Sequence, residues 1–137
     1  MDPLSMTASI TAVLQITGTI ISYIKDVREA SKEQTVLGME VSELKSLLTV
    51  LQMRVRDADS GEPWFAAVRT LGAKDGPLDQ FKFALEQLAS KLGQVNGLKR
   101  VAKTLIWPFD KTEIKGMLDA IERLKSLVGL ALGNDLL

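Results

Sequence analysis

Two stretches of this 137-residue chain repeat apolar residues at alternating intervals of three and four positions. An α-helix turns about once every 3.6 residues, so the apolar positions of each stretch share one helix face. The first stretch carries Leu37, Val41, Leu44, Leu48, Leu51 and Val55, and the second carries Leu78, Phe81, Leu85, Leu88, Leu92 and Val95. A helix with one apolar stripe must bury it against neighbouring helices. The two stripes therefore predict a helical bundle.

Breaker residues divide the rest of the chain into further helical segments. We expect long helices at about 3–30, 33–57, 77–95 and 110–134, and short connecting helices at 63–71 and 98–106. No stretch shows the period of two that a half-buried strand requires. The sequence therefore predicts one all-α domain over residues 1–137, a helical bundle of four long helices plus one or two short connecting helices.

Particular residues carry this prediction. Asp2 is expected to cap the first helix ahead of Pro3, and Asp110 with Glu113 has the spacing of a capping box. The positions expected in the core are Leu44, Leu48, Leu85, Leu88, Ile121 and Leu124.

The stretch from Met6 to Ile24 contains no charged residue and is nearly long enough to cross the hydrocarbon core of a bilayer. At about 100° per residue, its large apolar side chains gather on one side and its small polar residues on the other. The apolar side carries Ile10, Val13, Leu14, Ile20, Ile21, Ile24 and Val27, and the polar side carries Thr7, Thr11, Gln15, Gly18 and Ser22. The pattern predicts an amphipathic helix with an uncharged polar face.

Two interpretations of this helix stay open. It is either a core helix with a weakly polar outer face, or a segment that packs in a soluble protein and later enters a membrane. A charge at mid-bilayer costs about 2.5–3.5 kcal/mol, so the absence of charge is what insertion requires. In the second interpretation the membrane-inserting residues are Leu4, Ile10, Val13, Leu14, Gln15, Ile16, Gly18, Ile20, Ile21 and Ile24.

The composition excludes several classes of function. Lys plus Arg and Asp plus Glu both number 17, and this balance argues against nucleic acid as a partner. Cysteine and histidine are absent, which removes thiol chemistry, the commonest general base and the commonest transition-metal ligand. No glycine-rich phosphate loop is present. We therefore expect a protein that is not an enzyme and binds no cofactor or metal. Because Asp2 stands where a secretory signal carries Lys or Arg, we also expect a cytoplasmic location.

A basic cluster lies towards the end of the chain. It consists of Lys99, Arg100, Lys103, Lys111 and Lys115, with Trp107 and Phe109 between its members. Basic residues beside exposed aromatic rings suit an anionic membrane surface. The alternative is that Trp107 is buried and the basic residues are ordinary solvated side chains. The acidic pairs Glu40 with Glu43 and Asp119 with Glu122 fall outside the apolar stripes, so we expect them on solvated faces.

Three of the stretches described above together resemble a known family. They are the opening MDPLSMTASITAVLQITGTIISYIKDVREAS, the segment EVSELKSLLTVL, and the later LIWPFDKTEIKGMLDAIERLKSLVGLAL. In order and spacing they resemble the HeLo-like N-terminal domain of fungal STAND (NLR-type) receptors and related cell-death proteins. The resemblance covers essentially the whole chain.

The resemblance implies a cell-death effector that is similar in architecture to the four-helix executioner domain of the mixed-lineage-kinase-like necroptosis protein. It implies that copies of the domain self-associate and release the first helix. The domain would then move from the cytoplasm to the plasma membrane, bind its anionic lipids and permeabilise the membrane. The resemblance also implies downstream or partner STAND/NLR or amyloid-signalling regions, none of which lies within these residues. The alternative is an interaction module that self-associates or docks a partner without direct membrane activity.

Overall fold

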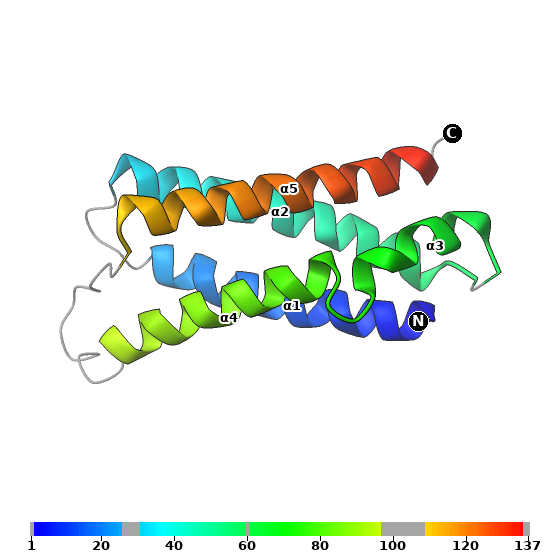
Figure 1. Cartoon of the computed structure of the whole chain (residues 1–137), viewed down its shortest axis with the longest axis horizontal. Coiled ribbons are helices and arrows are strands. Elements are labelled where there is room, and N and C mark those ends of the chain that lie inside the picture. Colours follow the sequence, from blue (N-terminus) through cyan, green and yellow to red (C-terminus); the bar gives the residue numbers. More distant parts are fainter. Residues whose placement is uncertain (1, 26–30, 60, 97–108, 136–137) are drawn as a thin grey trace.

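The computed structural model describes residues 2–25, 31–59, 61–96 and 109–135 (Figure 1). Four long helices account for most of them: α1 (Pro3–Lys25), α2 (Lys32–Arg56), α4 (Pro77–Asn96) and α5 (Lys111–Asp135). A short α3 (Pro63–Val68) continues into the 3₁₀ turn η1 (Arg69–Gly72). These described residues contain no strand. The predicted all-α bundle is therefore confirmed, while the expected connecting helix at 98–106 and the end of the first helix at 26–30 lie outside the described residues.

The four long helices pack as a bundle in which consecutive long helices run in opposite directions (Figure 1). α1 packs mainly against α2 and α4, and α5 packs mainly against the same two helices. α1 and α5 therefore occupy opposite corners of the bundle. The start of α1 and the end of α5 lie at the same end of the molecule, where α3 also packs against α5.

The core follows the apolar stripes. All six of the positions predicted to be buried are at most 5% exposed: Leu44, Leu48, Leu85, Leu88, Ile121 and Leu124. α1 contributes Met6, Ile10, Val13, Ile20 and Ile24, and α3 with η1 contributes Phe65, Val68 and Leu71. The burial prediction is confirmed for the whole stripe of α2 and for Leu78, Phe81, Leu85 and Leu88 of α4, while the side chains of Leu92 and Val95 lie outside the described part of the structure.

Side-chain caps begin α1 and α5 where the sequence predicts them, and α2 begins with a capping box that was not predicted. The Ser5 amide donates to Asp2 Oδ1 at 2.7 Å, and this hydrogen bond lowers the pKa of the Asp2 carboxyl. The Glu113 amide donates to Asp110 Oδ1 at 2.8 Å and the Asp110 amide to Glu113 Oε1 at 3.4 Å, which completes the capping box. Ser31 and Gln34 form a second capping box at the start of α2.

The turn between η1 and α4 depends on a glycine. A Cβ atom at Gly76 would lie 2.8 Å from the Thr70 carbonyl oxygen and 2.9 Å from that of Ala73. The preceding Asp75 has a φ of 61°, in the left-handed region that few residues other than Gly, Asn and Asp adopt. This tight turn brings α4 back along α1.

Candidate functional site

α1 is long and apolar enough to cross a membrane by length and composition. Its 23 residues span about 34 Å at a rise of about 1.5 Å each, against a hydrocarbon thickness of about 30 Å. A core helix of a soluble protein passes the same test when most of it is buried. Only 28% of the residues in the most apolar window of α1 are buried. The chemistry of its outer face therefore decides what the helix can do.

The outer face of α1 is exposed and uncharged. Gln15, Thr19 and Ser22 are exposed, and Lys25, the last residue of the helix, is its one charged residue. The exposure predicted for Gln15 is confirmed. Of the candidate inserting residues, Leu4 is 81% exposed, Leu14, Ile16, Gly18 and Ile21 are half-buried, and Ile10, Val13, Ile20 and Ile24 are buried.

α1 is rotated about its own axis, so that its threonines lie closer to the core than the apolar pattern predicts. Thr17 is fully buried among the core residues, although the apolar pattern did not predict it there. Thr7 and Thr11 are half-buried, so their expected place on the exposed polar side is only partly correct. Leu14 and Ile21, expected on the core side, pack at its margin. In this orientation α1 packs against both α2 and α4.

Most of the hydroxyl groups of α1 are satisfied within the helix itself. Each of these side chains donates a hydrogen bond of 2.8–3.2 Å to a backbone carbonyl one turn earlier: Thr7, Ser9, Thr11, Thr17 and Thr19. This is the pattern by which Ser and Thr are accommodated in a helix without an outside partner. These five residues therefore need no water and no other helix to satisfy their donors.

One hydrogen bond joins α1 to another helix among the described residues. Gln52 Nε2 on α2 donates to Thr11 Oγ1 at 2.6 Å. Apart from this contact, α1 is held in the bundle by apolar packing.

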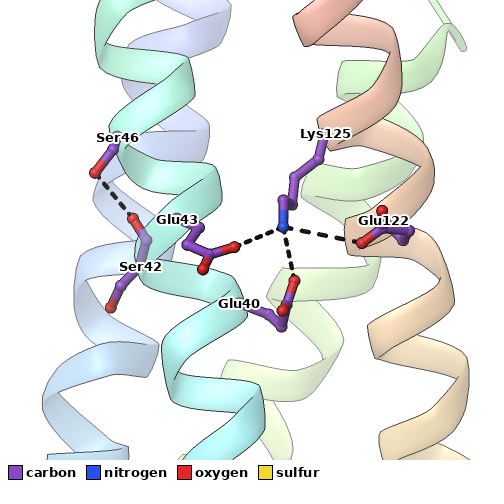
Figure 2. Close-up of polar contacts among 6 residues, drawn as sticks. All are labelled: Glu40, Ser42, Glu43, Ser46, Glu122 and Lys125. Carbon is purple, nitrogen blue, oxygen red and sulfur yellow. Dashed lines mark hydrogen bonds and ion pairs between the residues drawn. The ribbon is translucent and has the colours of Figure 1, made fainter.

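α5 is held differently, by a cation placed between two carboxylates of α2. Lys125 Nζ lies 2.8 Å from Glu40 Oε2 and 2.7 Å from Glu43 Oε2, and 3.9 Å from Glu122 on its own helix (Figure 2). The hydrogen bonds to Glu40 and then Glu43 raise the pKa of Lys125. We refer to Glu40, Glu43 and Lys125 as the lysine clamp.

The lysine clamp corrects a sequence-based expectation. The expected exposure is confirmed for Glu43, Asp119 and Glu122, but Glu40 is half-buried, and the carboxylates of Glu40 and Glu43 both bind Lys125 instead of being only solvated. Their spacing of three residues, which places both on one side of α2, was the available signal. The sequence alone did not show that a lysine 82 residues further along packs between them.

Further polar contacts hold α5 along its length. Lys91 on α4 pairs with Glu113 at 2.8 Å, near the start of α5. Near its end, Trp64 Nε1 donates to the Ala131 carbonyl oxygen at 2.8 Å. The Trp64 ring, on α3, in turn contacts Arg54 of α2, whose guanidinium lies 4.2 Å from the ring centre, within cation–π distance.

The structure describes only part of the basic cluster. Lys111 and Lys115 are exposed on the first turns of α5, and Lys111 lies 3.9 Å from Glu33. Lys99, Arg100, Lys103 and Trp107 lie outside the described residues. Phe109 is only 9% exposed and lies under Lys91, so it does not supply the exposed aromatic ring that the membrane-surface interpretation used.

No group of three or more acidic side chains converges as a metal site within the described residues. Comparison with protein-family models, with curated proteins and with solved structures finds no match to this chain. The length, exposure and lack of charge of α1 are therefore the features of the described bundle that bear on its function.

Proposed function

We propose that this chain is a regulated cell-death effector domain that permeabilises the plasma membrane through α1 when copies of it are brought together. The observation that carries the proposal is that, among the described residues, no ion pair joins α1 to another helix, so its release would separate no charge from its partner. It is uncharged from Pro3 to Ile24, and its one described hydrogen bond to another helix joins two neutral groups. The resemblance to HeLo-like domains supports the same function.

A bilayer offers α1 a replacement for the contacts that it loses. Release exposes five buried apolar side chains, each worth roughly 1.5–3 kcal/mol when removed from water. Insertion covers these side chains again and also covers Leu4, Leu14, Ile16 and Ile21, which are exposed or half-buried in the bundle. In hydrocarbon every backbone polar group must be satisfied internally, which a helix achieves. The hydroxyl groups bonded to their own helix reduce the remaining polar cost.

Basic residues would direct the domain to an anionic, cytoplasmic membrane face. Lys111 and Lys115 are exposed at the end of the bundle where α1 finishes. With Lys99, Arg100 and Lys103 they make up the proposed surface-binding cluster, and each contributes about 1 kcal/mol near an anionic surface. In this proposal the domain waits in the cytoplasm and is activated by partner STAND/NLR or amyloid-signalling regions.

The test is leakage from dye-loaded vesicles, made with and without anionic lipid, after the chain is clustered through a fused, ligand-induced dimerisation module. Clustered wild-type protein should release dye, and more so from anionic vesicles. Gln15→Glu should leave stability within about 0.5 kcal/mol, because Gln15 is exposed. It should reduce leakage more than tenfold, because insertion of a carboxylate costs about 2.5–3.5 kcal/mol.

Gln87→Glu is the matched control, since Gln87 is an exposed glutamine on α4 and the substitution makes the same change of charge. It should leak like the wild type. Full leakage by Gln15→Glu, or no leakage by the clustered wild type, would contradict the proposal.

The second candidate is an interaction module without membrane activity. Four large apolar side chains exposed along the outside of α2 favour it, namely Val36, Met39, Val50 and Met53. Self-association without leakage in the same experiment would select this candidate.

A further inference from the structure

α2 carries a second apolar stripe, on the side of the helix that faces away from the bundle. Val36 is 38% exposed, Met39 59%, Val50 52% and Met53 60%. At about 100° per residue, this stripe is centred roughly 150° from the buried stripe of α2. Four large apolar side chains in line on an outer face are more than the single exposed residues of an ordinary surface.

The outer stripe keeps the spacing of a coiled-coil seam over the full helix. Intervals of four and three alternate without a break through Lys32, Val36, Met39, Glu43, Ser46, Val50, Met53 and Asp57. This is the pattern of helices that pack along each other at a shallow angle. We call these eight residues the outer seam.

The outer seam is symmetric about its own midpoint, between Leu44 and Lys45. When a second α2 is laid antiparallel about this point, Val36 comes opposite Met53 of the second copy, and Met39 opposite Val50. Each a position of the heptad then meets a d position, which is the pairing that antiparallel coiled coils form. By the two-fold symmetry each of these apolar layers occurs twice.

The polar residues of the outer seam match in the same register. Lys32 comes opposite Asp57 of the second copy, so opposite charges meet at each end of the seam. At the centre Glu43 comes opposite Ser46, whose hydroxyl donates to the Ser42 carbonyl oxygen at 3.2 Å in the bundle and would have to rotate to donate to the carboxylate. Glu43 already pairs with Lys125 in its own bundle, which reduces the cost of excluding water from it (Figure 2). A polar layer within an apolar seam fixes register and orientation.

The residues along one flank of the outer seam allow close approach. Thr35, Ser42 and Thr49 are exposed, small and uncharged, and Arg56, the last residue of this flank, is its one charged member, so the flank brings no like charges together across a two-fold axis. No apolar partner within the described bundle covers the seam, since its four apolar residues stay exposed.

We propose that the outer seam binds the outer seam of a second copy of this chain, as an antiparallel two-fold dimer. The dimer would supply the self-association on which the proposed function rests, but it requires no lipid. It is therefore testable on soluble protein.

The first measurement is sedimentation equilibrium over a wide range of protein concentration. The wild type should shift from one to two chain masses as the concentration rises. Met39→Glu and Val50→Lys should each weaken this association at least about tenfold, because each places a charge in two of the apolar layers. Phe83→Glu is the control, since Phe83 is a similarly exposed apolar residue on α4, 62% exposed. It should dimerise like the wild type.

The second measurement tests the register. When the Met39→Glu and Val50→Lys proteins are mixed, the mixed dimer contains one Glu–Lys layer and keeps the other apolar layer. Mixing should therefore restore dimers that neither variant forms alone. A parallel pairing would not place these two positions together, so it predicts no recovery.

The outcomes separate the dimer from the membrane function. A monomeric wild type at high concentration, or self-association unaffected by Met39→Glu, would overturn the dimer. If the dimer is correct and the proposed function is not, soluble dimers form but clustered protein does not leak. If both are correct, Met39→Glu protein stays monomeric alone and leaks when clustered by the fused module.

Discussion

α1 and α5 occupy opposite corners of one bundle and pack against the same two helices, yet they are held by different forces. α5 is connected by the lysine clamp, by the Lys91–Glu113 pair and by the Trp64–Ala131 hydrogen bond. α1 has a comparable apolar face but only the Gln52–Thr11 hydrogen bond among the described residues.

The difference matters because apolar packing and ion pairs respond differently to a bilayer. An apolar helix can exchange a protein core for hydrocarbon with little net loss. A helix that leaves an ion pair and enters hydrocarbon must desolvate its charge, which costs several kcal/mol. In the proposed function α1 is therefore the helix that is released, and α5 is the helix that remains in the bundle.

The largest expected effect tests whether the two helices are equally well packed. Ile20 on α1 and Ile121 on α5 are each 1% exposed and line the same small apolar cavity in the core. Ile20→Ala and Ile121→Ala should each lower the free energy of unfolding by about 2–5 kcal/mol. Urea denaturation measures both. A loss below about 0.5 kcal/mol for Ile20→Ala alone, typical of a surface site, would show that α1 is not a core helix.

The intermediate effect tests the anchoring of α5. Lys125→Met keeps the apolar stem but leaves Glu40 and Glu43 without their cation, and Lys125 is only 18% exposed. We expect a loss of about 1.5 kcal/mol, between the values for surface and buried pairs. Because folding raises the pKa of Lys125, its contribution is complete below the ordinary pKa of lysine and is lost as the pH rises through the raised value.

The measurement is denaturation of wild type and Lys125→Met at a series of pH values. Their difference in stability should be constant from neutral pH up to the ordinary lysine pKa and shrink above it. Lys115→Met is the control, since Lys115 is exposed on the same helix and has no ion pair in the described structure. Equal losses of stability in Lys125→Met and Lys115→Met would show that the lysine clamp does not anchor α5. The proposed difference between α5 and α1 would then be wrong.

The smallest expected effect concerns the hydrogen bond that joins α1 to α2. Gln52→Leu removes the donor to Thr11 and should lower stability by about 0.5–1 kcal/mol. Thr11 keeps its hydrogen bond to the Thr7 carbonyl, so its own donor stays satisfied. Clustered Gln52→Leu protein should therefore leak at least as readily as the wild type. Reduced leakage would mean that this hydrogen bond helps the membrane-bound form instead of retaining α1.

Local patterns in the sequence were sufficient for the architecture. The buried stripe from Leu37 to Val55 and the Asp110–Glu113 capping box depend on residues within one or two turns of each other, so their spacing predicts them. The lack of charge from Pro3 to Ile24 was visible in the composition of that stretch, and the exposure of Gln15 was visible in the spacing of its apolar residues. The basic cluster was visible too, but the burial of Phe109 was not.

Only the tertiary structure decided how the helices hold each other. Lys125 reaches Glu43 across 82 positions, Trp64 reaches Ala131 across 67, and Gln52 reaches Thr11 across 41. Helical periodicity gives the side of a helix on which a residue lies, but not which helix packs there or with what rotation. The sequence by itself thus determined a four-helix bundle with an uncharged first helix. The tertiary structure decided that, among the described residues, α5 is anchored by ion pairs and α1 by apolar packing with one neutral hydrogen bond, because each ion pair requires two helices to be brought into contact at a particular depth and angle.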